Sequence, residues 1–135
     1  MRLDELRTGL QAFMAHAARS SYPVVGNRVY YWPWPQGATL PLLAIARVSS
    51  GGLYHRMGSR ATPVEVDFQI SAFASSVAQA EQALALAIDD LDGYAGAMGS
   101  ISVGMVKLMT MNPEVYETDS GLFHCSADVR VSYEP

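Results

Sequence analysis

Three histidines and one cysteine are the residues best suited to metal binding or nucleophilic chemistry. His16, His55 and His124 are far apart in the sequence, and no two of them have the spacing of a metal-binding motif. Cys125 follows His124 directly, but neighbouring residues of a strand point to opposite faces of a sheet, so this pair is badly placed as nucleophile and base. We therefore interpret the histidines as ordinary polar residues and Cys125 as a buried structural residue.

Motifs of known enzyme classes do not occur in the sequence. There is no GxSxG nucleophile elbow and no GxxxxGK(S/T) phosphate loop, and the glycines between Gly93 and Gly99 do not form a GxGxxG turn. A single cysteine also excludes an internal disulfide framework and a multi-cysteine metal site. The sequence predicts a protein that is not an enzyme, with no catalytic residue, no metal site and no cofactor.

An acidic cluster of Asp89, Asp90 and Asp92 marks the end of a predicted helix. Acidic side chains there oppose the helix dipole by about a few tenths of a kcal/mol each. No calcium-binding loop pattern accompanies them. The cluster is either a solvated helix end or one side of a contact with a basic patch on a neighbouring subunit.

Two further segments have the composition of contact surfaces. Trp32 and Trp34 alternate with prolines in a stiff loop, and tryptophan is enriched in binding hot spots. The alternative is that these rings fold back over the sheet. The second segment, Gly51 to Arg60, is a basic excursion between two strands that a partner could order; the alternative is a hairpin tip without a role. Its candidate contact residues are Tyr54, His55, Arg56, Met57 and Arg60.

The elements that position these residues can be predicted from apolar spacing. Helical spacing predicts a first helix over residues 3–20, which Tyr22-Pro23 ends. A second helix starts after Ser76, which forms a capping box with Gln79, and Gly93 suits its C-terminus. Alternation and turn residues predict strands at 28–32, 40–49, 61–74, 101–111, 115–118 and 123–133, the last two joined by a hairpin turn.

This order of elements predicts an α+β fold. An antiparallel β-sheet of four main strands and a short hairpin partner packs against two α-helices in a single domain over residues 1–135. The length of 135 residues fits one domain, which can bury a core without a disulfide or a metal. The first residues do not resemble a signal peptide, and no apolar run approaches the length of a membrane span, so we expect no membrane association.

Charge is unevenly distributed along the chain. Residues 6–64 carry six arginines and no acid, whereas residues 65–135 carry eleven acids and two bases. The net charge of −4 argues against a dedicated nucleic-acid binder. Either the two halves face each other within the fold, or the surface has a positive and a negative side suited to head-to-tail association.

The order of the elements, together with several short phrases, resembles a family of virion proteins. The phrases are Arg28-Val29-Tyr30-Tyr31 after an N-terminal helix, the stretch from Pro35 to Pro41, and the stretch from Val64 to Ile70. The chain resembles the tail-terminator and tail-completion proteins of long-tailed bacteriophages and related gene-transfer particles. This resemblance covers nearly the whole chain.

The resemblance implies a homo-oligomeric ring, a hexamer, that caps the tail tube, stops its polymerisation and joins the tail to the head. The implied partners are further copies of the chain, the tail tube protein and a head-completion or connector protein. DNA would pass through the lumen without base-specific contact. The protein would be located in the tail or neck of a virion assembled in the bacterial cytoplasm.

The resemblance transfers no residue-specific motif for partner binding. The interface candidates therefore come from the residues themselves: Trp32, Trp34, Tyr54, His55, Arg56, Met57, Arg60, Asp89, Asp90 and Asp92. Three alternative functions remain open. The first is a head-completion or neck adaptor protein, and the second is an interaction module that binds through the Trp-Pro loop without forming a ring. The third is an enzyme of unrecognised type, which would need a concave pocket with perturbed titratable groups.

The charge pattern makes a first prediction. Replacing both Arg56 and Arg60 with glutamate is expected to weaken ring formation, and more so at low salt, where charge attraction is least screened. Native mass at two ionic strengths measures the effect. An unchanged assembly size and stability in the double variant would refute charge pairing by these residues.

Overall fold

The computed structural model describes residues 3–31, 38–49, 64–117 and 121–133, which form three helices and seven strands. In chain order the elements are α1 (Leu3–Ala15), α2 (Tyr22–Val25), β1 (Val29–Tyr31), β2 (Leu42–Ser49), β3 (Val64–Ala74), α3 (Val77–Leu91), β4 (Gly96–Met98), β5 (Ile101–Met111), β6 (Val115–Glu117) and β7 (Leu122–Tyr133).

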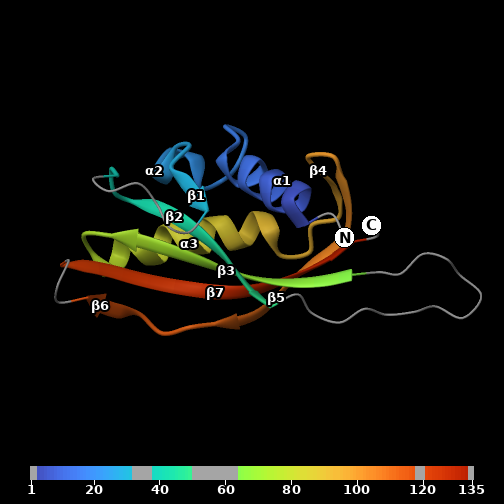
Figure 1. Cartoon of the computed structure of the whole chain (residues 1–135). Coiled ribbons are helices and arrows are strands. Elements are labelled where there is room, and N and C mark those ends of the chain that lie inside the picture. Colours follow the sequence, from blue (N-terminus) through green and yellow to red (C-terminus); the bar gives the residue numbers. More distant parts are fainter. Residues whose placement is uncertain (1–2, 32–37, 50–63, 118–120, 134–135) are drawn as a thin grey trace, which may run out of the picture.

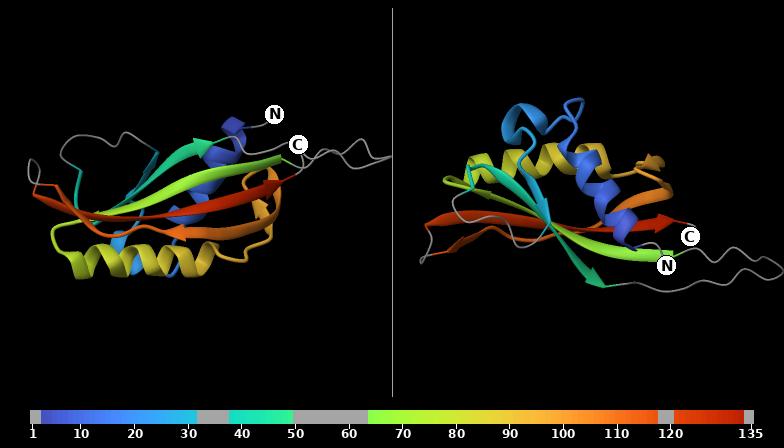
Figure 2. Two further views of the ribbon diagram at one scale, coloured as in Figure 1. Left: turned by 90° about the horizontal axis from the view of Figure 1, so that it is seen from below. Right: turned by 45° about the horizontal axis from the view of Figure 1, so that its top comes forward.

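The strands form one sheet with the order β1-β2-β3-β7-β5-β4, and β6 pairs with β7 next to β5. The three helices lie on one face of this sheet (Figure 1). Figure 2, in the view from below, shows the other face without a described helix across it. The predicted α+β class, with a sheet packed against helices, is therefore confirmed.

The long strands β3 and β7 form the middle of the sheet. They pair antiparallel over eleven residues, from Val64 opposite Tyr133 to Ala74 opposite Phe123. Their apolar residues alternate with polar ones, so both strands direct one apolar row towards the helices. That row joins the apolar stripes of α1 and α3 in the main core.

Helix α3 begins and ends at the residues that the sequence indicates. The Ser76 hydroxyl accepts a hydrogen bond from the Gln79 N–H at 3.3 Å, which satisfies one of the free donors of the first turn. At the other end, Asp92 is the C-cap residue and Gly93 adopts φ 83°, a conformation that glycine takes without a steric cost.

The first part of strand β2, Leu42–Ile45, is buried on both faces of the sheet. Leu43 and Ile45 face the helices and belong to the main core. On the opposite face, Leu42 and Ala44 form a small second cluster with Phe73. The partly buried residues packed against this cluster are Tyr30, Ala38, Leu40 and Leu122.

Three details differ from the sequence-based expectation. The first helix ends at Ala15, and Tyr22-Pro23 begins the short helix α2, where proline suits the first turn because no intrahelical donor is needed there. Strand β1 pairs parallel with β2, so the sheet is not antiparallel throughout. Strand β4 was not predicted; it is three residues long and pairs with the start of β5.

Helix α1 approaches the turn between β4 and β5 very closely at Gly9. A Cβ atom at this position would lie 2.7 Å from the carbonyl carbon of Met98, which is backbone and cannot swing away. On the other side of the contact, a Cβ at Gly99 would lie 3.0 Å from the Gly9 Cα. Position 9 is glycine, although it lies in the middle of a helix, because the backbone of Met98 occupies the space that a Cβ atom would need.

This contact predicts that Gly9→Ala destabilises the protein by about 1–3 kcal/mol through overpacking. In an unpacked helix the same change would be stabilising. Urea unfolding measures the difference. Gly104→Ala is the matched control, since its Cβ would lie 3.5 Å from the Ser132 carbonyl oxygen, an ordinary contact distance. Equal effects of the two substitutions would contradict the close packing of α1.

Candidate interaction surface

The residues proposed as contacts from the sequence fall into two groups. Those of the Trp-Pro loop and of the basic excursion lie outside the described residues, and their roles stay predictions: Trp32, Trp34, Tyr54, His55, Arg56, Met57 and Arg60. The three aspartates of the acidic cluster lie at the C-terminal end of α3 and are described.

Two of these three aspartates bind other parts of the same chain. The carboxylate of Asp90 accepts hydrogen bonds from the backbone N–H of Ser20 at 2.6 Å and from its hydroxyl at 2.9 Å. Asp92 Oδ1 accepts the backbone N–H of Leu108 on β5 at 3.0 Å. Asp89 is exposed. The charge at this helix end is therefore partly satisfied by backbone and hydroxyl donors from within the fold.

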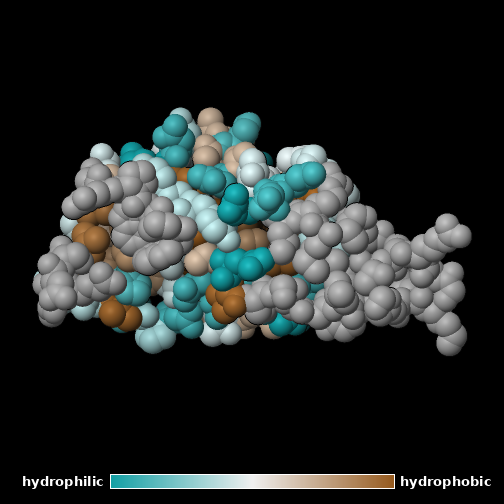
Figure 3. Space-filling view, viewed as in Figure 1, coloured by the Kyte–Doolittle hydropathy of each residue, from teal (hydrophilic) through white to brown (hydrophobic). Residues whose placement is uncertain are grey.

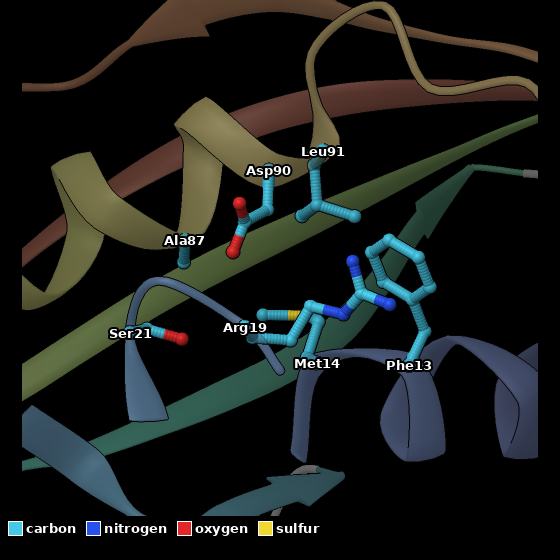
Figure 4. Close-up of a pocket in the computed structure, with 7 residues that line it drawn as sticks. All are labelled: Phe13, Met14, Arg19, Ser21, Ala87, Asp90 and Leu91. Atoms are coloured by element: carbon cyan, nitrogen blue, oxygen red, sulfur yellow. The ribbon is translucent and has the colours of Figure 1, made fainter. Parts of the chain in front are cut away.

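Asp90 borders a crevice between α3 and the segment after α1 (Figure 4). In this crevice the Arg19 guanidinium carbon lies 3.8 Å from the centre of the Phe13 ring, a cation–π contact. The side chains fill the crevice and leave no room for a water molecule. It is a packed junction between elements and not a ligand pocket.

Two open grooves run along α1, with volumes of about 290 and 330 Å³. Both are lined by Thr8 and Ala12 among other residues, and the acidic residues that line the first are Asp4 and Glu5. Glu5 accepts a hydrogen bond from the Ser100 hydroxyl at 2.7 Å. Neither groove is lined by a described histidine, cysteine, lysine or arginine.

The cysteine and its neighbouring histidine are placed as the sequence predicts. Cys125 is buried in the main core, and burial followed by the charges of Glu81 and Glu114 raises the pKa of its thiol to about 11. A thiol with such a pKa is protonated and unreactive at neutral pH. His124 points to the other face, where its ring stacks on Phe73 with a centroid separation of 5.0 Å.

His16 has a local role, because its Nδ1 accepts the backbone N–H of Ala18 at 3.0 Å. Among the described residues, no three histidine, cysteine, aspartate or glutamate side chains are grouped so that they could hold a metal ion. In the same part of the chain, no helix is long and apolar enough to cross a membrane.

Residues 6–64 form the basic half of the chain and residues 65–135 the acidic half, and the described ion pairs do not connect these two halves. Arg130 donates to both oxygens of Asp67, at 2.8 and 3.2 Å, and lies 3.4 Å from Glu65; all three belong to the acidic half. The other described ion pair, Arg7 with Asp4 at 3.9 Å, lies within α1. No ion pair between described residues joins the basic half to the acidic half.

Exposed apolar side chains gather on β5 and β6, a surface that is not among the contacts predicted from the sequence. Seven large hydrophobic side chains are exposed in the described part of the chain, and five of them lie between residues 105 and 116: Met105, Met109, Met111, Val115 and Tyr116. In the described part of the face shown in Figure 3, hydrophobic residues form small, separate areas among hydrophilic ones. A run of methionines that breaks the apolar–polar alternation of β5 is the sequence signal for this surface.

Comparison with solved structures shows that this fold occurs in a virus-like particle. The chain aligns with a chain from a structure described as the virion of a native gene transfer agent particle, with a TM-score of 0.69 and 17% sequence identity. The alignment covers 96% of this chain and 94% of the other. At this identity the likeness establishes a shared fold over nearly the full length of both chains. No protein-family model and no curated protein sequence matches the chain.

The contacts of the acidic cluster predict different effects for two neighbouring aspartates. Asp90→Ala is expected to lower the free energy of unfolding by about 1 kcal/mol, because two hydrogen bonds to Ser20 are lost. Asp89→Ala removes a similar charge from an exposed position and is expected to change stability by less than about 0.5 kcal/mol. Chemical denaturation of both variants measures the difference, and equal stabilities would show that the Asp90 contacts contribute nothing.

Proposed function

We propose that this protein is a non-enzymatic structural component of a phage-like particle and acts as its tail terminator. In this role, copies of the chain form a hexameric ring that caps the tail tube, ends its polymerisation and joins the tail to the head or connector. The observation that carries the proposal is the fold shared with a chain of a gene transfer agent virion over nearly the full length of both chains. The sequence resemblance to tail-terminator proteins, which rests on different information, points to the same class.

The distribution of charge supports assembly into a ring. A ring requires a heterologous contact, in which one side of a subunit meets a different side of its neighbour. Among the described residues, no ion pair joins the basic half to the acidic half, and Arg47 and Asp89 are exposed, which supports a contact between unlike sides of two copies. Opposite charges on opposite sides favour the head-to-tail orientation and disfavour the inverted one.

The proposed partners follow from this role. They are further copies of the chain, the tail tube protein and a head-completion or connector protein, and the protein resides in the tail or neck of the particle. DNA passes through the ring without specific binding. The predominance of acids in residues 65–135 is compatible with such passage, because acidic surface repels the phosphate backbone.

Light scattering on a sizing column tests the ring, with the protein alone and with its tail tube subunit. We expect a discrete species of six 14.6 kDa chains, either free or at the end of the tube. Addition of the protein is also expected to stop elongation of growing tubes. A chain that stays monomeric and ignores the tube would overturn the proposal.

The same experiment separates the alternatives. A ring that binds a connector but not the tube would favour the head-completion or neck adaptor. A monomer or dimer that loses a partner when Trp32 and Trp34 are replaced with alanine would favour the interaction module without a ring.

A further inference from the structure

Strands β5 and β6 together form one side edge of the sheet. Both pair with β7 on the same side, and the Asn112 N–H between them donates to the Ser126 carbonyl of β7 at 2.9 Å (Figure 1). The first part of this edge is occupied. Strand β4 pairs with Ile101–Val103, Gly93 and Tyr94 exchange hydrogen bonds with Val106, and Asp92 binds the Leu108 N–H.

Beyond Leu108 no described strand pairs with the outer side of this edge, and apolar side chains are exposed there. We call this stretch the methionine edge. It consists of Met109, Met111, Val115 and Tyr116, with 43, 53, 45 and 51% of each residue exposed. An unpaired strand edge with apolar side chains is a template for association, and methionine adapts its shape to a partner. The length and composition of this stretch therefore point to a partner surface.

The surroundings of the methionine edge are negatively charged. Glu114, between β5 and β6, shares a hydrogen bond with Glu81 on α3, and this contact raises the pKa of Glu81 and lowers that of Glu114. Neither carboxylate forms an ion pair with another described residue. A partner that brings a cation would pair with these carboxylates, and an apolar side chain beside that cation would cover the exposed methionines.

A cation beside an exposed apolar side chain is found near the opposite edge of the same sheet, on β2. Strand β1 pairs with β2 only at Leu43–Ile45, so the end of β2 has no described neighbour on that side. Arg47 and Val48 lie in this free stretch, at a β-bulge between Arg47 and Ser49. Val48 is 59% exposed, and Arg47 is exposed and forms no ion pair with another described residue.

Strand directions allow these two edges to meet. Each of the pairs β2–β3, β3–β7 and β7–β5 is antiparallel, so β2 runs antiparallel to β5. Across the sheet, Arg47 is level with Leu108, through Phe68 and Val129. Two copies in the same orientation, displaced along the strands so that the end of β2 lies beyond Leu108, would bring Arg47 and Val48 of one against Met109 and Met111 of the next, in the antiparallel sense. Repetition of this contact closes a ring if the rotation between copies permits.

We propose that the free end of β2, with Arg47 and Val48, docks against the methionine edge of a second copy of this chain. The contact buries Val48 among methionine side chains and places Arg47 near the carboxylates on that side. It continues the sheet from one subunit to the next and supplies the heterologous interface of the ring. This inference rests on the proposed function and assigns the surfaces through which it is carried out.

Single substitutions on each edge test the assignment. Met111→Glu and Val48→Glu are each expected to weaken self-association at least about tenfold, because a carboxylate replaces an apolar contact. The matched control is Met105→Glu. Met105 is 52% exposed on the same strand, but it pairs with Ser132 outside the methionine edge. This control is expected to assemble like the unmodified protein, and circular dichroism with thermal unfolding checks that all three variants are folded.

Cysteine cross-linking gives an independent readout with small side chains. A Val48→Cys variant is mixed with a Met109→Cys variant and treated with a short bismaleimide; the native Cys125 is buried and does not compete. Covalent dimers are expected only in the mixture, because a heterologous contact joins unlike edges. Cross-linking of either variant with itself would instead indicate a two-fold contact and overturn the proposal.

The two proposals fail in different ways. If the unmodified protein forms the ring and both glutamate variants keep it, the edges are wrongly assigned while the terminator role stands. If the unmodified protein never associates, alone or on the tube, the terminator role and the edge contact are both wrong.

Discussion

The pairing of β3 with β7 is the interaction on which the rest of the structure depends. Eleven consecutive residue pairs fix the register, and a shift of one residue would turn the apolar row of each strand away from the helices. Strands β5 and β6 take their positions from β7, and β2 takes its position from β3. Helix α3 packs across both central strands and carries Asp90 and Asp92, which bind the N-terminal segment and β5. The positions of the neighbouring strands and of α3 therefore follow from the antiparallel pairing of β3 with β7.

The helices and strands that could be predicted from the sequence are those marked by residues close to one another in the chain. The alternation in β7 and the capping box at Ser76 lie within a few residues, so the elements could be predicted nearly to their ends. The direction of β1 and the existence of β4 depend on strands elsewhere in the chain, and no local pattern encodes them. Gly9 illustrates the same limit, since its reason is a backbone contact with Met98 on another element.

The candidate contact residues show a similar division. An acidic cluster is visible in the sequence, but the partner of Asp90 lies seventy residues away and only the fold brings it close. The methionine edge was missed because its residues disrupt the expected alternation of β5 and its exposure depends on which strands pair with β7. The basic character of residues 6–64 was visible at once, and the structure adds that no described ion pair ties it to the acidic half.

The central strand of this sheet is also the last element of the described chain, which has a consequence for synthesis on the ribosome. Strand β3 is made well before, and β5 shortly before, the strand that separates them, Leu122–Tyr133. Until then, β3 and β5 each lack a neighbour and expose apolar surface. Contacts this distant in sequence are also slow to form. The core of the subunit therefore cannot form before β7 has been made. A chain that ends before β7 would stay unfolded and become a substrate for chaperones or proteases.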